Sequence, residues 1–519
     1  YNLEASDTMS TPSSFKETGH PKGLRVLFAT EMWERFSYYG MRAILVLFMT
    51  KALLYDKALA SNLYGSYTGL VYLTPLVGGY IADRYWGNQR SIITGGLLMA
   101  IGQFLLFFCG STFQSSPGLS TLLFFAGLGV LIAGNGFFKP NISSMVGQLY
   151  PAGDRRIDAG YTIFYMGINT GGALGPLVCG LFGDTGNPAD FRWGFLAAGI
   201  GMLLGVLVFH LYKDKYVVDP SGKTLGLTPE SASGKKELKP AQILVYAALL
   251  AFSLAVIGIL YIDARLFGIL SYLLIISVVG IGYMIIGDKT LTLIEKKRIS
   301  VIFIVSFFVI FFWSAFEQAG ASLTFFAEEQ TQRDLGFRIV PASFFQSLNS
   351  IFVVSFAPLF AWVWIKLGAR NAEPASPTKM ALGLFFLAIG YLIIAYGVKG
   401  VQPGVKVSMM WLTSMYAFHT FGELCLSPIG LSLVNKLAPF RFASLLMAVW
   451  FLANAAANKF AGVLSALYPE AGKATPNFLG YQITGLYEFF MLFVGMAGIA
   501  SLILFGVSKY LQKIMNSGQ

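Results

Sequence analysis

Apolar runs separated by short polar segments follow one another along the whole chain. Each run is about 20 residues or longer, which is enough for an α-helix to cross the hydrocarbon core of a bilayer. The fourteen runs lie near residues 25–50, 61–83, 90–110, 119–147, 157–182, 191–212, 241–262, 266–286, 299–326, 343–367, 378–398, 408–436, 442–467 and 484–510. The pattern predicts an all-α membrane protein with fourteen transmembrane helices.

The polar intervals divide these runs into groups. The longest interval, 213–240, is rich in Lys, Ser, Gly, Pro and Thr and is typical of a linker. Six runs precede it, and a pair of runs with almost no charge in its spans follows it, which we expect to be a peripheral hairpin. The predicted units are an N-terminal segment 1–24, six helices in 25–212, a linker 213–240, an inserted helical hairpin 241–287, a second linker 288–298, six helices in 299–510, and a tail 511–519.

Composition agrees with this class, and the charge distribution predicts an orientation. The 519 residues are 55% hydrophobic and 12% charged, whereas a typical soluble domain has about 25% charged residues. With a cytoplasmic N-terminus, 24 of the 37 Lys and Arg residues fall on the inner side and nine on the outer side. This bias fits the positive-inside rule and places both termini in the cytoplasm. The net charge of +11 therefore reflects membrane orientation and does not indicate nucleic acid as a partner.

Catalytic and metal-binding patterns are absent from the sequence. The three cysteines, at 109, 179 and 425, lie in apolar runs, where a free thiol behaves as a small hydrophobic group. Neither a Ser/His/Asp constellation nor a Cys/His metal spacing is present. We therefore expect no enzyme activity, no catalytic residue, no metal and no cofactor.

The first apolar run carries an unusual set of polar side chains. Glu31, Arg35, Tyr38 and Arg42 fall within about 60° of one another on a helix, and Glu34 lies beside them. Each intramembrane charge costs at least ~2.5 kcal/mol. Four charges in one helix therefore need one another, a cavity or a substrate. A self-neutralised structural ion cluster is the alternative interpretation.

Other intramembrane polar residues raise the same question. Lys139, in the fourth run, needs an anionic partner, which could be a substrate or only a structural ion pair. Glu317 lies four residues after Trp313 on the same helix face, and we expect it to pair with Arg42. A glutamate beside a guanidinium stays ionised until a proton or a competing group disturbs the pair. The amide of Asn169 can both donate and accept hydrogen bonds, so it could bind a substrate or simply join two helices.

Four motifs occur in a consistent order along the chain. They are Glu31-x-x-Glu34-Arg35-Phe-x-Tyr38-Tyr39-Gly40, Gly134-x-Gly136-x-x-Lys139-Pro140, Phe164-Tyr165-x-x-x-Asn169-x-Gly171 and Gly422-Glu423-x-x-x-Ser427-Pro428. Together they resemble the proton-coupled oligopeptide transporter family of the major facilitator superfamily. The order of six, two and six helices looks like a major facilitator fold, with two six-helix bundles and an inserted hairpin, as in bacterial members of the family.

The resemblance implies a function and a site. It implies symport of di- and tripeptides with protons through a bacterial inner (plasma) membrane, driven by the proton gradient, and it leaves the oligomeric state open. The implied peptide-binding residues are Arg35, Tyr38, Tyr39, Arg42, Tyr67, Lys139, Asn169, Trp313, Asn349, Glu423, Ser427 and Trp450. The implied proton-coupling and gating residues are Glu31, Glu34, Arg35, Arg42, Lys139, Glu317 and Glu423.

Several alternatives stay open. The family includes nitrate carriers, so another small substrate such as nitrate or a drug is compatible with the fold, and a receptor without transport is a further possibility. Tyr64 and Tyr72 are interpreted as packing residues. His419 is either a packed imidazole or a proton carrier. Lys459 has no counterpart in the family pattern, and we expect it to extend towards the outer interface.

Overall fold

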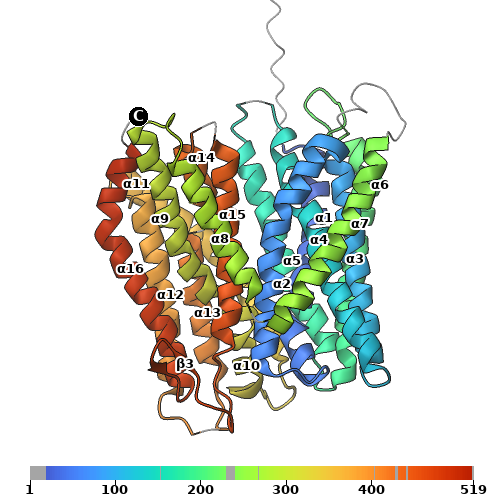
Figure 1. The fold of residues 1–519 in the computed structure, drawn as a ribbon, viewed down its shortest axis with the longest axis vertical. Coiled ribbons are helices and arrows are strands. Elements are labelled where there is room, and N and C mark those ends of the chain that lie inside the picture. Colours follow the sequence, from blue (N-terminus) through green and yellow to red (C-terminus); the bar gives the residue numbers. More distant parts are fainter. Residues whose placement is uncertain are drawn as a thin grey trace, which may run out of the picture.

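The protein is almost entirely helical, with long helices running between two ends of the molecule (Figure 1). The computed structural model describes residues 19–151, 153–228, 240–266, 268–402, 404–426, 430–439 and 442–516. Ser427, most of the predicted N-terminal segment and much of the 213–240 linker lie outside these ranges. The helices form two halves that stand side by side, blue to green in the first half and yellow to red in the second.

The first half contains six long helices, in agreement with the six predicted runs. Asp56 caps the second of them, because its carboxylate accepts a hydrogen bond of 2.7 Å from the amide of Leu59. The elements are α1 (Lys22–Lys51), α2 (Lys57–Ile81), the π-helical turn η1 (Ala82–Trp86), α3 (Gly87–Thr112), α4 (Pro117–Gln148), α5 (Ile157–Gly183), the short 3₁₀ helix η2 (Pro188–Asp190) and α6 (Phe191–Tyr216).

The hairpin and the second half complete the fold. Thr292 and Glu295 form a capping box at the start of α9. The elements are α7 (Pro240–Leu266), α8 (Ile269–Ile286), α9 (Leu293–Phe316), η4 (Glu317–Gly320), α10 (Ser322–Glu329), β1 (Thr331–Gln332), η5 (Ala342–Gln346), α11 (Ser347–Ala369), α12 (Ser376–Val398), β2 (Val407–Ser408), α13 (Met409–Leu426), α14 (Gly430–Leu437), α15 (Ala443–Ser465), β3 (Asn477–Phe478), β4 (Tyr481–Gln482) and α16 (Leu486–Asn516). β1 pairs in parallel with β2, and β3 pairs antiparallel with β4.

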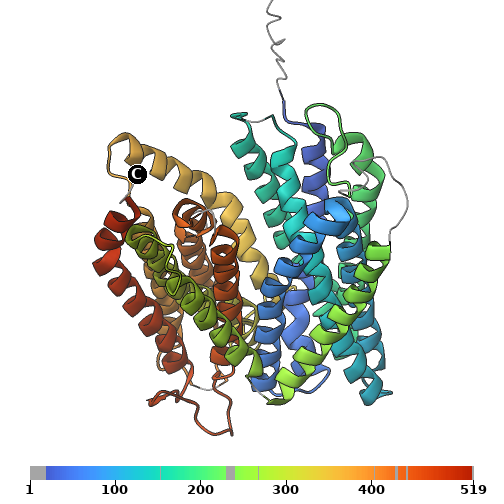
Figure 2. The same ribbon diagram turned by 45° about the horizontal axis from the view of Figure 1, so that its top comes forward.

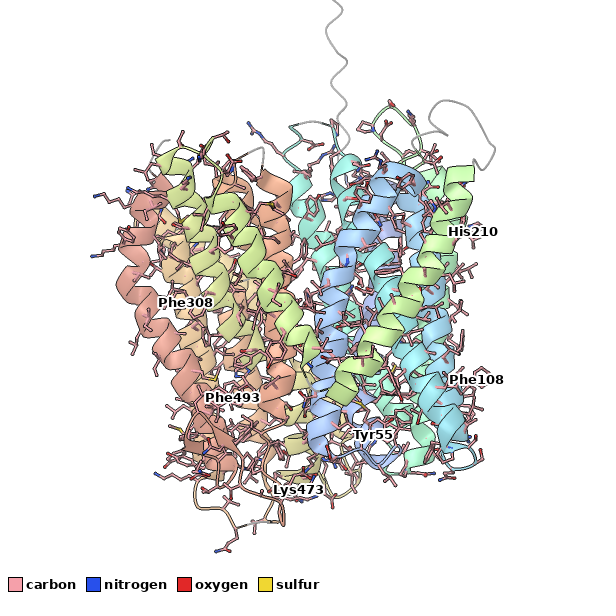
Figure 3. All side chains as sticks on the ribbon, viewed as in Figure 1. Tyr55, Phe108, His210, Phe308, Lys473 and Phe493 are labelled. Carbon is pink, nitrogen blue, oxygen red and sulfur yellow. The ribbon has the colours of Figure 1, made fainter. Side chains whose placement is uncertain are left out.

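The outer faces of these helices suit a lipid environment. Ten helical stretches among the described residues are long and apolar enough to cross a membrane. Large apolar side chains such as Leu122, Ile276 and Leu502 are exposed, and Phe108 projects from the flank of the molecule in Figure 3. Since long apolar helices with satisfied backbones are what a bilayer requires, the chain is an integral, multi-pass membrane protein.

One predicted run is not a continuous helix. The sequence predicts a spanning run near 299–326, and a helical stretch from Leu293 to Glu329 is found there. It is interrupted, because α9 ends at Phe316 and a 3₁₀ turn precedes α10. Tyr64 of α2 lies where a side chain on Gly320 would have to be, 1.9 Å from its ideal Cβ position. The amide of Gln318 donates to the carbonyl of Ala461 on α15 at 3.0 Å. Tertiary contacts thus stabilise the break, and the break places Glu317 between the two halves.

The two halves meet directly at one end of the molecule, which we call the joined end. It is the lower end in Figure 1, opposite the chain terminus marked C. Lys51 pairs with Glu328 there, Lys57 pairs with Glu329 at 2.6 Å, and the hydroxyls of Ser61 and Ser465 lie 2.9 Å apart. Among the described residues, the direct hydrogen bonds and ion pairs between the halves lie in the part of each helix nearer this end. The view in Figure 2 shows the halves diverging towards the other end.

The hairpin lies against both halves. Tyr261 of α7 packs on Phe125 of α4 with ring centroids 5.1 Å apart, and α7 also contacts α2. α8 packs on α15 of the second half. In Figures 1 and 2 the pair crosses the front of the boundary between the halves. The hairpin therefore contacts both halves from the outside, with exposed side chains such as Leu250 and Tyr272, which is compatible with the peripheral position that we expected.

Candidate functional site

A cavity of about 410 Å³ lies between the two halves, beyond their contacts at the joined end. Helices α1, α2, α4 and α5 form one side, and α9, α11, α13 and α15 form the other. Eleven of the predicted site residues line it: Glu31, Arg35, Tyr39, Arg42, Lys139, Asn169, Trp313, Glu317, Asn349, Glu423 and Trp450. The polar face predicted for α1 therefore points into a central space and not into lipid.

The first cluster in this cavity is built on Arg35. Its Nε lies 3.1 Å from Glu31 Oε1 and 2.5 Å from Glu34 Oε2. The amide of Asn135 on α4 donates to Glu34 at 3.1 Å. Two carboxylates therefore share one guanidinium in a fully buried position. Lys139 lines the same cavity.

The second cluster crosses the boundary between the halves. Arg42 Nη1 of α1 lies 3.2 Å from Glu317 Oε2, at the break after α9, so the pair predicted from the sequence is confirmed. The hydroxyl of Tyr64 donates to the same carboxylate oxygen at 3.5 Å. The ring of Tyr39 lies 5.3 Å from the guanidinium carbon of Arg42 and 5.9 Å from that of Arg35, which places an aromatic face between the two cations.

The facing side of the cavity carries an acid. The amide of Asn349 on α11 donates to Glu423 Oε2 on α13 at 2.8 Å and contacts the hydroxyl of Thr420 at 3.2 Å. Trp313 and Trp450 add two indole rings to this side. The first half thus contributes three cations and one acid to the cavity lining, and the second half contributes two acids and the Asn349 amide. An elongated zwitterion would find complementary charges for both of its ends.

Three predicted site residues lie behind the cavity surface. Tyr38 and Tyr67 are buried and stack on one another with centroids 6.4 Å apart. They do not line the cavity in this conformation, although both are among the implied peptide-binding residues. Glu34 is fully buried behind Arg35. Ser427 lies outside the described residues.

Sequence reasoning missed other lining residues. Tyr72, interpreted as a packing residue, lines the cavity, with its ring 4.6 Å from Lys139 Nζ. The ammonium of Lys139 within an apolar run was the available signal, since such a charge favours an aromatic face. Tyr165 and Gln346 also line the cavity. The Gln346 amide donates to Thr324 at 2.9 Å, a contact that no local pattern indicates.

His419 and Lys459 were the two unassigned polar residues. His419 packs against Tyr391 with ring centroids 4.6 Å apart and borders the cavity, which agrees with the interpretation as a packed imidazole. Lys459 does not extend to the outer interface, and that expectation is wrong. Its side chain is 2% exposed and pairs with Asp263 of α7 at 2.7 Å, because the hairpin supplies a carboxylate inside the membrane.

Comparison with known proteins gives one consistent result. The sequence matches the model of the POT family (PTR2) over residues 89–480. It is 35% identical over 472 residues to the peptide transporter YePEPT of Yersinia enterocolitica, covering 88% of this chain and 89% of that protein. It is also 34% identical over 518 residues to a di-/tripeptide transporter of Lactococcus lactis, covering 96% and 97% of the two chains. The crystal structure of a peptide transporter POT in complex with sulfate is similar to this structure with a TM-score of 0.79, at 35% identity over 96% of both chains.

Proposed function

This chain belongs to the POT family, and from that premise we propose that it imports di- and tripeptides together with protons. The observation that carries the proposal is the charge arrangement of the cavity. Arg42 and Lys139 line its first half, and Glu423 lines its second half. Every di- or tripeptide has an ammonium and a carboxylate at its ends, whatever its side chains. A cavity with opposite charges on opposite sides can bind those ends and accept many side chains.

The proposed architecture is a major facilitator fold with fourteen transmembrane helices. Helices α1 to α6 form the first bundle, α9, α11, α12, α13, α15 and α16 form the second, and α7 with α8 forms the inserted hairpin. The excess of Lys and Arg in the loops at the end where α1 begins and α16 ends supports a cytoplasmic position for that end. The membrane is the bacterial inner membrane, and the joined end faces outward. The conformation is then closed to the outside.

Substrate binding follows from this arrangement. The peptide carboxylate lies near Arg35, Arg42 or Lys139, and the peptide ammonium lies near Glu423 and Asn349, with Asn169 as a further donor and acceptor. The indoles of Trp313 and Trp450 and the ring of Tyr39 surround the side chains, because aromatic faces tolerate many shapes. A bound peptide joins the two bundles across the cavity.

Proton coupling uses the buried acids. Protonation of Glu317 removes its charge and releases Arg42, which weakens a contact between the bundles. Glu31 and Glu34 share Arg35, so a proton on either carboxylate alters the charge that faces the peptide. The bundles then rock around the central site. An inward proton gains ~2.3 kcal/mol per 100 mV of membrane potential, and this gradient drives accumulation without a cofactor.

The test is uptake into proteoliposomes with an imposed pH gradient. We expect labelled dialanine to accumulate when the outside is acidic, and accumulation to collapse when a protonophore removes the gradient. Unlabelled di- and tripeptides should compete for uptake, whereas free alanine and nitrate should not. Competition by nitrate alone, or binding of dialanine without accumulation, would overturn the proposal.

A further inference from the structure

The hairpin contributes a charged group to the membrane interior. Asp263, near the end of α7, accepts hydrogen bonds from Lys459 Nζ of α15 at 2.7 Å and from the hydroxyl of Ser66 of α2. Lys459 Nζ also donates to Ser66 Oγ at 2.7 Å. We call these three residues the buried node. All three are almost completely buried.

The carboxylate of Asp263 is well satisfied within the node. Its second oxygen accepts a hydrogen bond of 2.9 Å from the backbone amide of Leu270, in the first turn of α8. The amino end of a helix favours a negative charge, so α8 stabilises the ion that α7 carries. A fully hydrogen-bonded ion pair is tolerated in an apolar interior, whereas a single charge left without its partner is strongly unfavourable. The two charges of the node therefore depend on one another.

The node lies where the two halves approach most closely. Gly65 of α2 and Gly462 of α15 allow near contact of the two backbones, because a Cβ on Gly65 would lie 2.8 Å from the Gly462 Cα. A Cβ on Gly69 would lie 3.1 Å from the carbonyl oxygen of Ala455. Ser66 and Lys459 belong to these same two helices. The node therefore spans the contact between α2 and α15.

Separation of α2 from α15 must break or stretch the node. Lys459 would move with the second half, and Ser66 would move with the first half. The hairpin cannot follow both, since α7 packs on α2 and α4 while α8 packs on α15. Gly268, between α7 and α8, has a backbone φ of +126°, a region that favours glycine. It is the position at which the hairpin can bend.

We propose that the α7–α8 hairpin is a brace, by which we mean a structural connection between the two halves at the joined end. In this proposal Lys459 and Asp263 are positioning residues that stabilise the outward-closed state. The proposal rests on the proposed rocking of the two bundles but not on the identity of the substrate. The node favours closure because only the closed arrangement supplies Lys459, Ser66 and the α8 amide to one carboxylate. When the halves part at this end, the ion pair loses partners and the closed state loses its advantage.

The experiment measures the separation of the halves at the joined end without substrate. Spin labels are placed on exposed positions at this end, Leu119→Cys at the start of α4 and Phe337→Cys in the loop after β1. Double electron–electron resonance in lipid nanodiscs then gives the populations of short and long distances. The native cysteines are buried, and protein without the introduced cysteines reports their background labelling.

The decisive variant is the double substitution Asp263→Asn with Lys459→Met. It removes both charges and leaves no buried charge without a partner, so we expect the variant to fold. We expect the population with a long distance between the spin labels to rise at least about fivefold relative to the parent protein. Ser66→Ala removes only the hydrogen bonds that α2 contributes to the node. We expect it to raise the long-distance population by a smaller amount. Lys473→Met is the matched control, because Lys473 pairs with Glu470 at 2.8 Å in an exposed position at the same end.

The outcomes separate this inference from the proposed function. Parental distance distributions in both the double variant and Ser66→Ala would overturn the brace. If the double variant did not fold, Ser66→Ala alone would decide. A parent protein that carries no dipeptide in proteoliposomes would overturn the proposed function, while the distance measurement would still test the brace.

Discussion

Arg42 and Glu317 form an ion pair of 3.2 Å across the boundary between the two halves. Arg42 belongs to the continuous helix α1, whereas Glu317 occupies the break between α9 and α10. Both side chains line the central cavity. The Glu317 carboxylate therefore both lines the cavity and contacts the opposite half of the molecule. A change in its charge affects the electrostatics of the cavity and the contact between the halves.

Glu317→Gln should uncouple transport from the proton gradient. The amide keeps the shape of the side chain but neither bears the charge nor takes up the proton. We expect gradient-driven dialanine uptake to fall by at least about tenfold, which corresponds to ~1.4 kcal/mol. Counterflow of labelled against unlabelled dialanine should stay within about twofold, since it needs no net proton movement. Glu470→Gln is the control, because Glu470 pairs with Lys473 at 2.8 Å and does not line the cavity. Normal gradient-driven uptake by Glu317→Gln would contradict this assignment.

Two asparagines that line the cavity should differ in their effect on affinity. Asn349 donates to Glu423 at 2.8 Å, whereas Asn454 donates to the carbonyl of Trp450 in its own helix at 2.9 Å. A hydrogen bond to a charged group contributes about 1.5–3 kcal/mol. Asn349→Ala should therefore weaken dialanine binding about tenfold or more, and Asn454→Ala should change it by less than about threefold. Tryptophan fluorescence or calorimetric titration of the purified variants measures this, and equal losses would contradict the role given to Glu423.

The arrangement of charges was accessible from the sequence. Glu31, Arg35 and Arg42 fall on one face of a helix by its periodicity alone, and all three line the cavity. The pairing of Arg42 with Glu317 followed from the cost of an isolated intramembrane charge. These predictions succeeded because each rests on local helix geometry or on a strong energetic requirement.

The features that the sequence did not predict depend on contacts between distant parts of the chain. Asp263 lies 196 residues before Lys459 and close to the predicted end of an apolar run, so nothing local connects them. The apolar composition continues through the break at Glu317, and the contacts of Gly320 and Gln318 with α2 and α15 are what stabilise the break. Both features depend on which helices become neighbours. Matching each unassigned buried charge with an opposite one would have suggested the pair of Asp263 and Lys459.

Lys139 should contribute to recognition of the peptide carboxylate. It lines the side of the cavity formed by the first half, and its Nζ lies 4.6 Å from the ring of Tyr72. Lys139→Met should weaken competition by dialanine about tenfold, or ~1.4 kcal/mol. Competition by dialanine amide, which lacks the carboxylate, should change little. An equal loss of competition by dialanine and by dialanine amide would show that Lys139 does not recognise the carboxylate. Lys366→Met controls for the loss of a positive charge, because Lys366 lies at the end of α11 and stacks on Trp362.

Close contact between Gly65 and Gly462 should be required for closure at the joined end. A Cβ on Gly462 would lie 2.5 Å from the carbonyl oxygen of Ser61 and 2.7 Å from the Gly65 Cα, and neither backbone can move without separating α2 from α15. Overpacking of this kind costs about 1–3 kcal/mol, which should lower the ratio of closed to open protein by roughly 5- to 150-fold. The spin-label pair at Leu119 and Phe337 measures this shift. Gly495→Ala on α16 is the matched control, because no atom lies within 4 Å of its added Cβ. The Gly495→Ala control reports the effect of alanine on helix stability alone. A Gly462→Ala variant with the same spin-label distances as the parent protein would show that α2 and α15 close without this backbone contact.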